Sequence, residues 1–157
     1  AAPGIADQTV SAGHEVACHT WGHRNALKSW PWDAVGDVAA GYEALSRWMP
    51  GDALFRPPCG KLTLPVALAL CRRGARLGWW TIDSGDTHTV LPDPAQIERS
   101  VAEGEGGVVL LHDFDRGPET AATRSTFVLE VTDRLLRLAA RERLAVRPLG
   151  ELLEMDR

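Results

Sequence analysis

Short apolar runs alternate with helical segments along the whole chain, and this alternation constrains the fold more than any other feature. Runs with the length and composition of β-strands cover residues 15–18, 53–55, 77–82, 107–111 and 144–147. They are continuously apolar, as expected for strands that are covered on both faces. The order predicts an α/β fold with a parallel sheet and crossover helices. Five strands are too few for a closed eight-stranded barrel and fit a partial, distorted (β/α) barrel.

Helix start and stop signals bound the segments between these strands. Gly13 and Gly74 are each expected to end a helix, because glycine is common just after the last helical residue. Thr63 is expected to cap the start of a helix. In the longest segment, Val128 and Val131 share one apolar face with Leu135 and Leu138. The expected helices cover 5–12, 33–49, 63–74, 93–104 and 119–142, with a short closing helix that begins at Pro148.

Composition suits one domain over residues 1–157 and excludes several classes of protein. The net charge is −4 with acidic and basic residues mixed along the chain, so no basic stripe points to nucleic acid. No apolar run is long enough to span a membrane, no signal peptide is visible, and the compartment stays open. The three cysteines predict no disulfide framework, and Cys18 and Cys71 are expected to be at least partly buried. Most of the six tryptophans are expected in the core.

A polar cluster follows each of the first four expected strands. His19 and His23 follow the first, 56–60 the second, 83–86 the third, and His112 with its neighbour Asp113 the fourth. In parallel α/β folds the carboxyl ends of the strands open onto one face, where active sites form. A pair of metal-binding imidazoles, a cation, two carboxylates and a third histidine are therefore expected to converge.

Each cluster alone also has a simpler interpretation. A pair of histidines four residues apart is more often coincidence than a metal site. Arg-Pro-Pro at 56–58 is compatible with a rigid turn, and Asp-Ser-Gly-Asp at 83–86 is ordinary turn chemistry. His112 could be a core histidine that hydrogen bonds to the backbone. The order of all four clusters makes the functional interpretation the stronger one.

The clusters together resemble the polysaccharide deacetylases, the chitooligosaccharide deacetylase homology domain. The family's His-Ser/Thr-x-x-His motif matches residues 19–23, and its Arg-x-Pro-x-Gly motif matches 56–60. Its Leu-x-His-Asp motif matches 110–113. Its Asp-x-x-Asp-Trp motif is matched in part by 83–86, with Thr87 where tryptophan is usual. The resemblance covers essentially the whole chain.

The resemblance implies metal-dependent hydrolysis of an N-acetyl group on an amino-sugar polymer or oligosaccharide. In that scheme His19 and His23 bind a divalent ion, with Zn²⁺ expected, which lowers the pKa of a bound water molecule to about 7. His112 protonates the leaving amine, and Asp86 orients and charges it. The partner is an N-acetylated glycan.

The resemblance also implies roles for residues around these groups. Arg56 positions the base carboxylate, and the backbone N–H of Cys59 helps to hold the oxyanion. The acetyl pocket is expected to be lined by Leu110, Trp80 and Pro58. Thr87 in place of tryptophan would widen or re-polarise that pocket, which leaves a deacylase of another amide as an alternative.

The family's Thr-Phe-Asp-Asp-Gly motif, which supplies the base and the third metal ligand, is absent. The 18 residues before His19 hold one aspartate, Asp7, which reads as helical and as a poor substitute; Glu15 and Asp113 are closer in sequence to the site. We therefore expect a domain that is truncated at its N-terminus and lacks the first strand, which would be supplied in cis or in trans. A non-catalytic relative that binds carbohydrate is the alternative from another functional class.

Overall fold

Parallel pairing of short backbone segments confirms the predicted α/β class. Strand β1 (Ile82–Asp83) pairs in parallel with β2 (Val109–Leu110), with Ile82 opposite Val109. Phe55 forms parallel bridges with both Cys18 and Leu77. The ladder around Phe55 is well formed, because its N–H donates to the Arg76 carbonyl at 2.8 Å and its carbonyl accepts from the Gly78 N–H at 2.9 Å.

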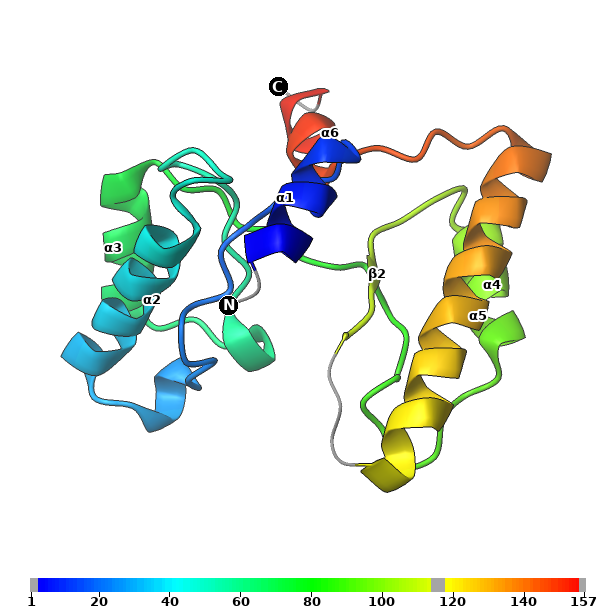
Figure 1. Cartoon of the computed structure of the whole chain (residues 1–157), viewed down its shortest axis with the longest axis horizontal. Coiled ribbons are helices and arrows are strands. Elements are labelled where there is room, and N and C mark those ends of the chain that lie inside the picture. The colour runs from blue at the N-terminus through cyan, green and yellow to red at the C-terminus, as the bar shows by residue number, and fades with distance from the viewer. Residues whose placement is uncertain (1–2, 114–117, 156–157) are drawn as a thin grey trace. The chain divides into compact units, whose positions relative to one another are not determined.

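The structure, a computed structural model, describes residues 3–113 and 118–155 (Figure 1). It divides into two units, which are described separately below. Unit 1 contains Ala1–Trp79 and Pro148–Arg157, and unit 2 contains Trp80–Arg147. The single domain expected over 1–157 stays a prediction.

Among its described residues, unit 1 holds four α-helices and two short 3₁₀ helices. Proline in the first turn begins both α2 and α3, where its fixed φ suits the helix and its missing N–H costs nothing. Gly74, with φ of 74°, ends α3 as predicted. Helix α2 packs against α3. The elements are α1 (Pro3–Ser11), η1 (Ala26–Lys28), α2 (Pro31–Leu45), η2 (Pro58–Gly60), α3 (Leu64–Arg73) and α6 (Leu149–Met155).

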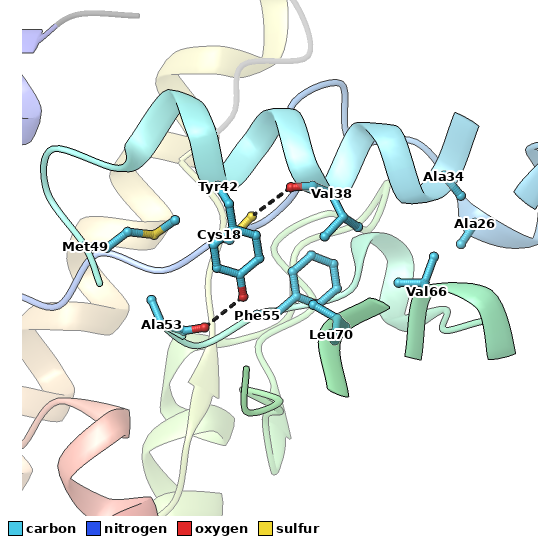
Figure 2. Close-up of a cluster of buried hydrophobic side chains, with 10 residues drawn as sticks. All are labelled: Cys18, Ala26, Ala34, Val38, Tyr42, Met49, Ala53, Phe55, Val66 and Leu70. Carbon is cyan, nitrogen blue, oxygen red and sulfur yellow. Dashed lines mark hydrogen bonds between the residues drawn. The ribbon is translucent and has the colours of Figure 1, made fainter. Parts of the chain in front are cut away.

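The core of unit 1 forms where α2 and α3 meet the bridged segments (Figure 2). Phe55 is 1% exposed, and its ring stacks with that of Tyr42 at 6.4 Å between centroids. The buried Tyr42 hydroxyl donates to the Ala53 carbonyl at 2.8 Å, which satisfies its polar end. Cys18 is fully buried beside Val38 on α2. The segment that leads into residue 19 is thus anchored in this core.

Unit 2 packs two helices against its two-stranded sheet. Asp93 caps α4 (Pro94–Glu103) by accepting from the Ala95 N–H at 2.9 Å. Helix α5 (Pro118–Glu142) packs along α4 and buries Val131 fully. Val128, Leu135 and Leu138 are buried or partly buried on the same side, which confirms the predicted apolar face.

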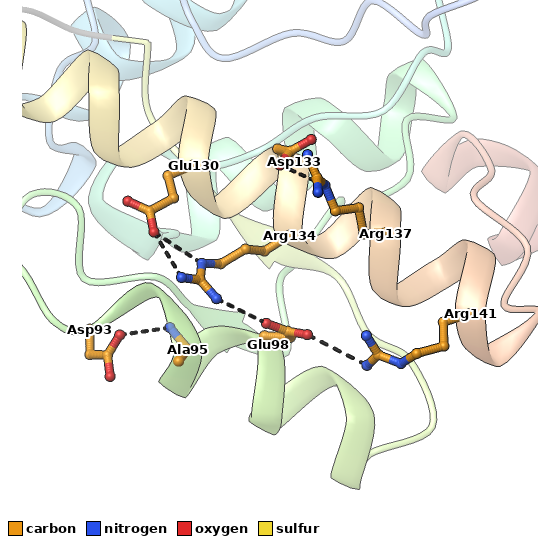
Figure 3. A network of polar contacts seen from close by, with 8 residues as sticks. All are labelled: Asp93, Ala95, Glu98, Glu130, Asp133, Arg134, Arg137 and Arg141. Atoms are coloured by element: carbon orange, nitrogen blue, oxygen red, sulfur yellow. Dashed lines mark hydrogen bonds and ion pairs between the residues drawn. The ribbon is translucent and has the colours of Figure 1, made fainter.

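An ionic network joins the outer surfaces of α4 and α5 (Figure 3). Glu98 on α4 accepts from Arg134 at 3.4 Å and from Arg141 at 3.5 Å, both on α5. Arg134 also contacts Glu130 one turn away at 3.0 Å, and the hydrogen bond to Glu130 raises the pKa of Arg134. The side chains of Glu130 and Arg141 are largely exposed, so their ion pairs add little to stability.

The predicted strands are wrong in length, and one is wrong in kind. The five apolar runs contribute at most two paired residues each, and the described part of 144–147 forms no strand. Arg143, with φ of 58°, ends α5 in the left-handed region, and the Leu144 N–H donates back to Ala139 at 2.8 Å. The N–H of Leu144 is therefore not available to pair with another strand. Val146 is 71% exposed, so the side chains of this run are not covered as those of a buried strand would be.

Other expectations are also corrected. Helix α2 begins at Pro31 rather than Asp33 and ends at Leu45 rather than near Met49. Cys71 is exposed, because Val66 and Leu70 form the buried side of α3. The three cysteines are free thiols, as predicted. The tryptophans are not in the core: Trp21, Trp30, Trp32 and Trp79 are exposed, and Trp48 and Trp80 are half-buried.

No helix in the described ranges is both long enough and apolar enough to cross a bilayer.

Candidate active site

The two imidazoles of the His-Thr-x-x-His segment lie together in unit 1. The ring centroids of His19 and His23 are 4.8 Å apart, with an edge-on angle of 70° between their planes. His23 is exposed and His19 is half-buried. The segment follows Cys18 directly, at the end of the bridged backbone. The two imidazoles of the predicted metal pair therefore contact each other, while the convergence of all four polar clusters stays a prediction.

The backbone of the second cluster fixes the tautomer of His19. The Nδ1 atom of His19 lies 2.7 Å from the carbonyl oxygen of Arg56. A carbonyl oxygen only accepts, so Nδ1 must carry the proton and Nε2 is the nitrogen with a lone pair. Metal-binding histidines are commonly oriented by such a hydrogen bond from the other ring nitrogen.

The loop that carries the histidines has an uncommon backbone. Thr20 and His23 have φ of 65° and 52°, in the left-handed region that residues other than glycine seldom adopt. The Thr20 hydroxyl accepts from the His23 N–H at 3.0 Å. The carboxylate of Asp37 on α2 accepts from Gly22 N–H at 2.7 Å and from Arg24 N–H at 3.3 Å. The loop is thus closed by side chains on its own turn and on the neighbouring helix.

The Arg-Pro-Pro-Cys-Gly segment forms a tight turn in unit 1. Arg56 is half-buried, which lowers the pKa of its guanidinium, and its Nε donates to the Gly78 carbonyl at 3.0 Å. Cys59 is exposed with φ of 55° and Pro58 is buried. The Gly60 N–H donates back to the Pro57 carbonyl at 3.1 Å. This turn gives the Cys59 peptide a fixed direction; the oxyanion role of its N–H stays a prediction.

Asp86 and His112 form a doubly bonded pair in unit 2. Asp86 is 3% exposed, and its Oδ2 accepts from the backbone N–H of His112 at 2.5 Å. Its Oδ1 lies 2.9 Å from His112 Nδ1. The carboxylate acts as acceptor here, so Nδ1 is protonated and Nε2 is the reactive nitrogen. The His112 side chain is 35% exposed, so the ring combines a buried anchor with access to solvent.

Turn chemistry holds Asp86 at this position. The Asp83 carboxylate accepts from the Gly85 N–H at 2.9 Å, and Gly85 has φ of 67°. The Asp86 N–H donates to the hydroxyl of the fully buried Ser84 at 3.3 Å. From α5, Arg124 donates to the backbone carbonyl of Asp86 and, at 3.1 Å, to that of His88.

The expected acetyl-pocket residues belong to different units. Leu110 is 7% exposed and points away from the helix-side cluster that its neighbours Val109 and Leu111 join, because side chains alternate along a strand. Trp80 is half-buried at the start of unit 2, and Pro58 lies in unit 1. Their role as a pocket stays a prediction.

The carboxylates considered as substitutes for the absent aspartates have other partners. Asp7 on α1 accepts from Trp48 Nε1 at 2.7 Å and pairs with Arg47 at 3.2 Å. Glu15 accepts from the Gly150 N–H on α6 at 2.9 Å. Asp113 is exposed at the edge of the described residues. Within 3–113 and 118–155, no three His, Cys, Asp or Glu side chains gather in a way that could hold a metal ion.

The described geometry groups the predicted residues into two sets. His19, His23 and Arg56 meet in unit 1, and Asp86 and His112 meet in unit 2. Sequence reasoning missed two supporting residues, Asp37 and Arg124. Asp37 leaves a signal, because it is an acidic residue in phase with the apolar positions that bury one side of α2. Arg124 leaves none, because it is one of many arginines on α5.

Comparison with known proteins agrees with the resemblance in the motifs. The family model described as polysaccharide deacetylase matches residues 1–78. A peptidoglycan-N-acetylglucosamine deacetylase of Bacillus cereus is 28% identical over 124 residues, which cover 76% of this chain and 58% of the relative. A chitooligosaccharide deacetylase of Bradyrhizobium is 31% identical over 130 residues, which cover 79% of this chain and 58% of the relative. The chain thus spans little more than half the length of these relatives.

Solved structures share the fold. A family 4 carbohydrate esterase from Streptomyces lividans superposes with a TM-score of 0.70 at 22% identity, over 89% of this chain and 68% of that protein. A family 4 pseudoenzyme from Bacillus anthracis superposes with a TM-score of 0.59 at 20% identity, over 83% of this chain and 46% of that protein. The matched family model and the two sequence relatives support a polysaccharide deacetylase family domain in this chain.

Proposed function

We propose that the chain carries catalytic residues of a hydrolase that removes N-acetyl groups from an amino-sugar polymer or oligosaccharide. The observation that carries the proposal is the buried Asp86 carboxylate, which holds both the N–H and the Nδ1 of His112. This arrangement suits Nε2 of His112 to pass a proton to a leaving amine. A protein that only binds glycan has no evident need for it. The activities named for the two sequence relatives support the substrate class.

His19 and His23 are the residues that would hold a divalent metal ion, with Zn²⁺ as the first choice. Their fit rests on the ring contact at 4.8 Å and on the Arg56 carbonyl, which leaves Nε2 of His19 as the donor nitrogen. When bound, such an ion would lower the pKa of a water molecule toward about 7. Imidazole also binds other divalent transition metals, so the choice of zinc over those metals is part of the proposal.

The remaining residues would act on the acetamide. Arg56 would position a base carboxylate, and the Cys59 N–H would donate to the oxyanion that develops on the carbonyl. Leu110, Trp80 and Pro58 would enclose the methyl group. His112 would then donate its proton to the amine as the C–N bond breaks, with Asp86 as the counter-charge.

The third metal ligand and the base would come from a segment beyond these 157 residues, in cis or in trans. The partners of Asp7 and Glu15 support this, because both carboxylates are engaged at helices α1 and α6. That segment would add the expected first strand to the partial, distorted (β/α) barrel that the sequence predicts.

A non-catalytic relative that binds carbohydrate is the second candidate. One observation favours it: the described residues hold two clustered imidazoles and no third ligand beside them. A deacylase of a different amide is a variant of the first candidate, supported by Thr87 in the position after Asp86 where the family usually has tryptophan.

Acetate release separates these candidates. We expect the 157-residue chain to release little acetate from chitooligosaccharides or peptidoglycan, and the chain extended by its natural upstream segment to release it in the presence of zinc. His112→Ala in the extended chain should abolish release while glycan binding persists. Glycan binding without acetate release in the extended chain would favour the non-catalytic candidate. Full activity from the 157 residues alone would contradict the proposal that the third metal ligand and the base come from another segment.

A further inference from the structure

Helix α2 presents one buried carboxylate to the loop that carries the histidine pair. Asp37 is 8% exposed, and its two carboxylate oxygens accept from the N–H groups of Gly22 and Arg24 at 2.7 and 3.3 Å. Its backbone carbonyl accepts from the Trp21 N–H at 3.0 Å. Three donors on both sides of His23 therefore end on a single residue of a packed helix.

The same side of α2 touches the loop one turn further on. A Cβ atom at Gly41 would lie 2.7 Å from the Thr20 carbonyl carbon, closer than real Cβ contacts allow, and 3.0 Å from the Cys18 Sγ, which is also tight. Residues 37 and 41 are four apart and lie above one another on the helix. The helix therefore holds the loop through Asp37 and meets its backbone directly at Gly41.

The loop needs such a support because of its conformation. Thr20 and His23 both have positive φ, a conformation that persists in non-glycine residues only where the surroundings impose it. The hydrogen bond from the His23 N–H to the Thr20 hydroxyl lies within the same turn. The hydrogen bonds to Asp37, in contrast, tie this turn to a rigid element.

We propose that Asp37 is a positioning residue for the histidine pair: it holds His23 in its left-handed conformation and so sets the imidazole of His23 against that of His19. The inference rests on the proposed function only in taking that pair as the metal site. Asp37 does not contact a metal ion or substrate in this scheme; it acts through the backbone N–H groups on either side of His23.

Two variants and a matched control test this role. Asp37→Ala removes both acceptors, and Asp37→Asn keeps the shape and one acceptor oxygen without the charge. Asp33→Asn is the control, because Asp33 is exposed on the first turn of the same helix and the change removes the same charge. Thermal unfolding of each variant shows whether the fold is retained, and Asp37→Asn carries the test where the alanine variant does not fold.

The first readout needs no metal. The measurement uses the protein that contains all 157 residues. Amide hydrogen exchange at Gly22 and Arg24 should become at least about tenfold faster in the Asp37 variants, and it should stay unchanged in Asp33→Asn. The nuclear Overhauser contact between the ring protons of His19 and His23 should weaken with it. Unchanged exchange and an unchanged ring contact in a folded Asp37 variant would overturn the proposal.

The second readout is zinc affinity, measured calorimetrically with zinc alone. Loss of an orienting partner should weaken binding by about 10- to 100-fold in Asp37→Ala, with a smaller effect in Asp37→Asn. Faster exchange with an unchanged zinc affinity would show that Asp37 stabilises the loop without positioning the ligands, and would overturn the proposal. If the unsubstituted protein binds no zinc, the proposed metal site fails, and the ring contact still decides the role of Asp37.

Discussion

Asp86 holds His112 through two separate atoms: its Oδ2 accepts from the backbone N–H at 2.5 Å and its Oδ1 accepts from Nδ1 at 2.9 Å. The first hydrogen bond fixes the position of the His112 backbone just after β2, and the second fixes the tautomer and the orientation of the imidazole ring. Because Asp86 is almost completely buried, its charge is screened little by solvent. One carboxylate therefore sets both the position and the chemical state of the proposed acid.

Asp86→Asn should separate these two effects. The amide keeps the size of the side chain, but only one of its two polar atoms can accept, so one bond to His112 is lost or reversed. We expect a fall in turnover of roughly 10²- to 10⁴-fold, the range found for loss of general acid–base catalysis, with little change in KM. Turnover is measured as the rate of acetate release by the chain extended by its natural upstream segment. Glu103→Gln, an exposed change on α4, is the control, and equal turnover in both variants would remove Asp86 from the mechanism.

Zinc affinity should distinguish the paired histidines from one outside the pair. His19→Ala and His23→Ala each remove a proposed ligand, so each should weaken zinc binding by more than the roughly 10- to 100-fold that loss of an orienting partner costs. His14→Ala is the matched control, because His14 is exposed and lies outside the motif. Calorimetric titration with zinc measures all three. A similar loss in His14→Ala, or none in the other two, would contradict the assignment.

The helices could be predicted from sequence better than the strands, for a physical reason. Helix ends are encoded by single residues, such as the cap Asp93 and the left-handed Gly74, and both act where expected. Strand length depends on a partner that is distant in sequence. The run after Arg143 has strand-like composition, but its first N–H is used to close α5 and Val146 faces solvent.

The site could be predicted in part because its chemistry is concentrated in motifs. His112 and Asp86 come from different motifs, and their hydrogen bond follows from the parallel pairing of β1 with β2. The position of Asp37 among the buried residues of α2 signals a buried carboxylate, but its partners could not be predicted, since they depend on which loop lies over α2. The tryptophans were predicted wrongly because hydrophobic character alone does not separate a core ring from an exposed one such as Trp30, which stacks on Trp32 at 5.2 Å.

Alkaline pH should destabilise unit 1 through its buried acids. Burial raises the pKa of the Cys18 thiol above its ordinary value of 9.0, and it raises the pKa of the Tyr42 hydroxyl as well. Both groups are neutral in the folded state and lose a proton more easily when unfolded. Their contribution to stability is therefore fully present below about pH 9 and is lost as the pH rises through the folded pKa values.

Urea unfolding between pH 7 and pH 11 measures this effect. The free energy of unfolding should fall with rising pH above about 9. Cys18→Ala should make that fall shallower, even though the cavity it creates lowers stability at every pH. Cys71→Ala is the control, because Cys71 is exposed. A slope that is the same in the unsubstituted protein and in Cys18→Ala would contradict a role for the Cys18 thiol.

Two glycines of α2 should respond to alanine with opposite signs. A methyl group at Gly36 would have no other atom within 4 Å, whereas one at Gly41 would meet the Thr20 backbone at 2.7 Å. Gly36→Ala should stabilise by roughly 0.5–1 kcal/mol, because alanine loses less conformational entropy in a helix. Gly41→Ala should destabilise by roughly 1–3 kcal/mol, because the helix or the histidine loop must move to relieve the overlap. Urea unfolding measures both, and zinc affinity should fall only in Gly41→Ala. Stabilisation by both substitutions would show that α2 does not press against the loop.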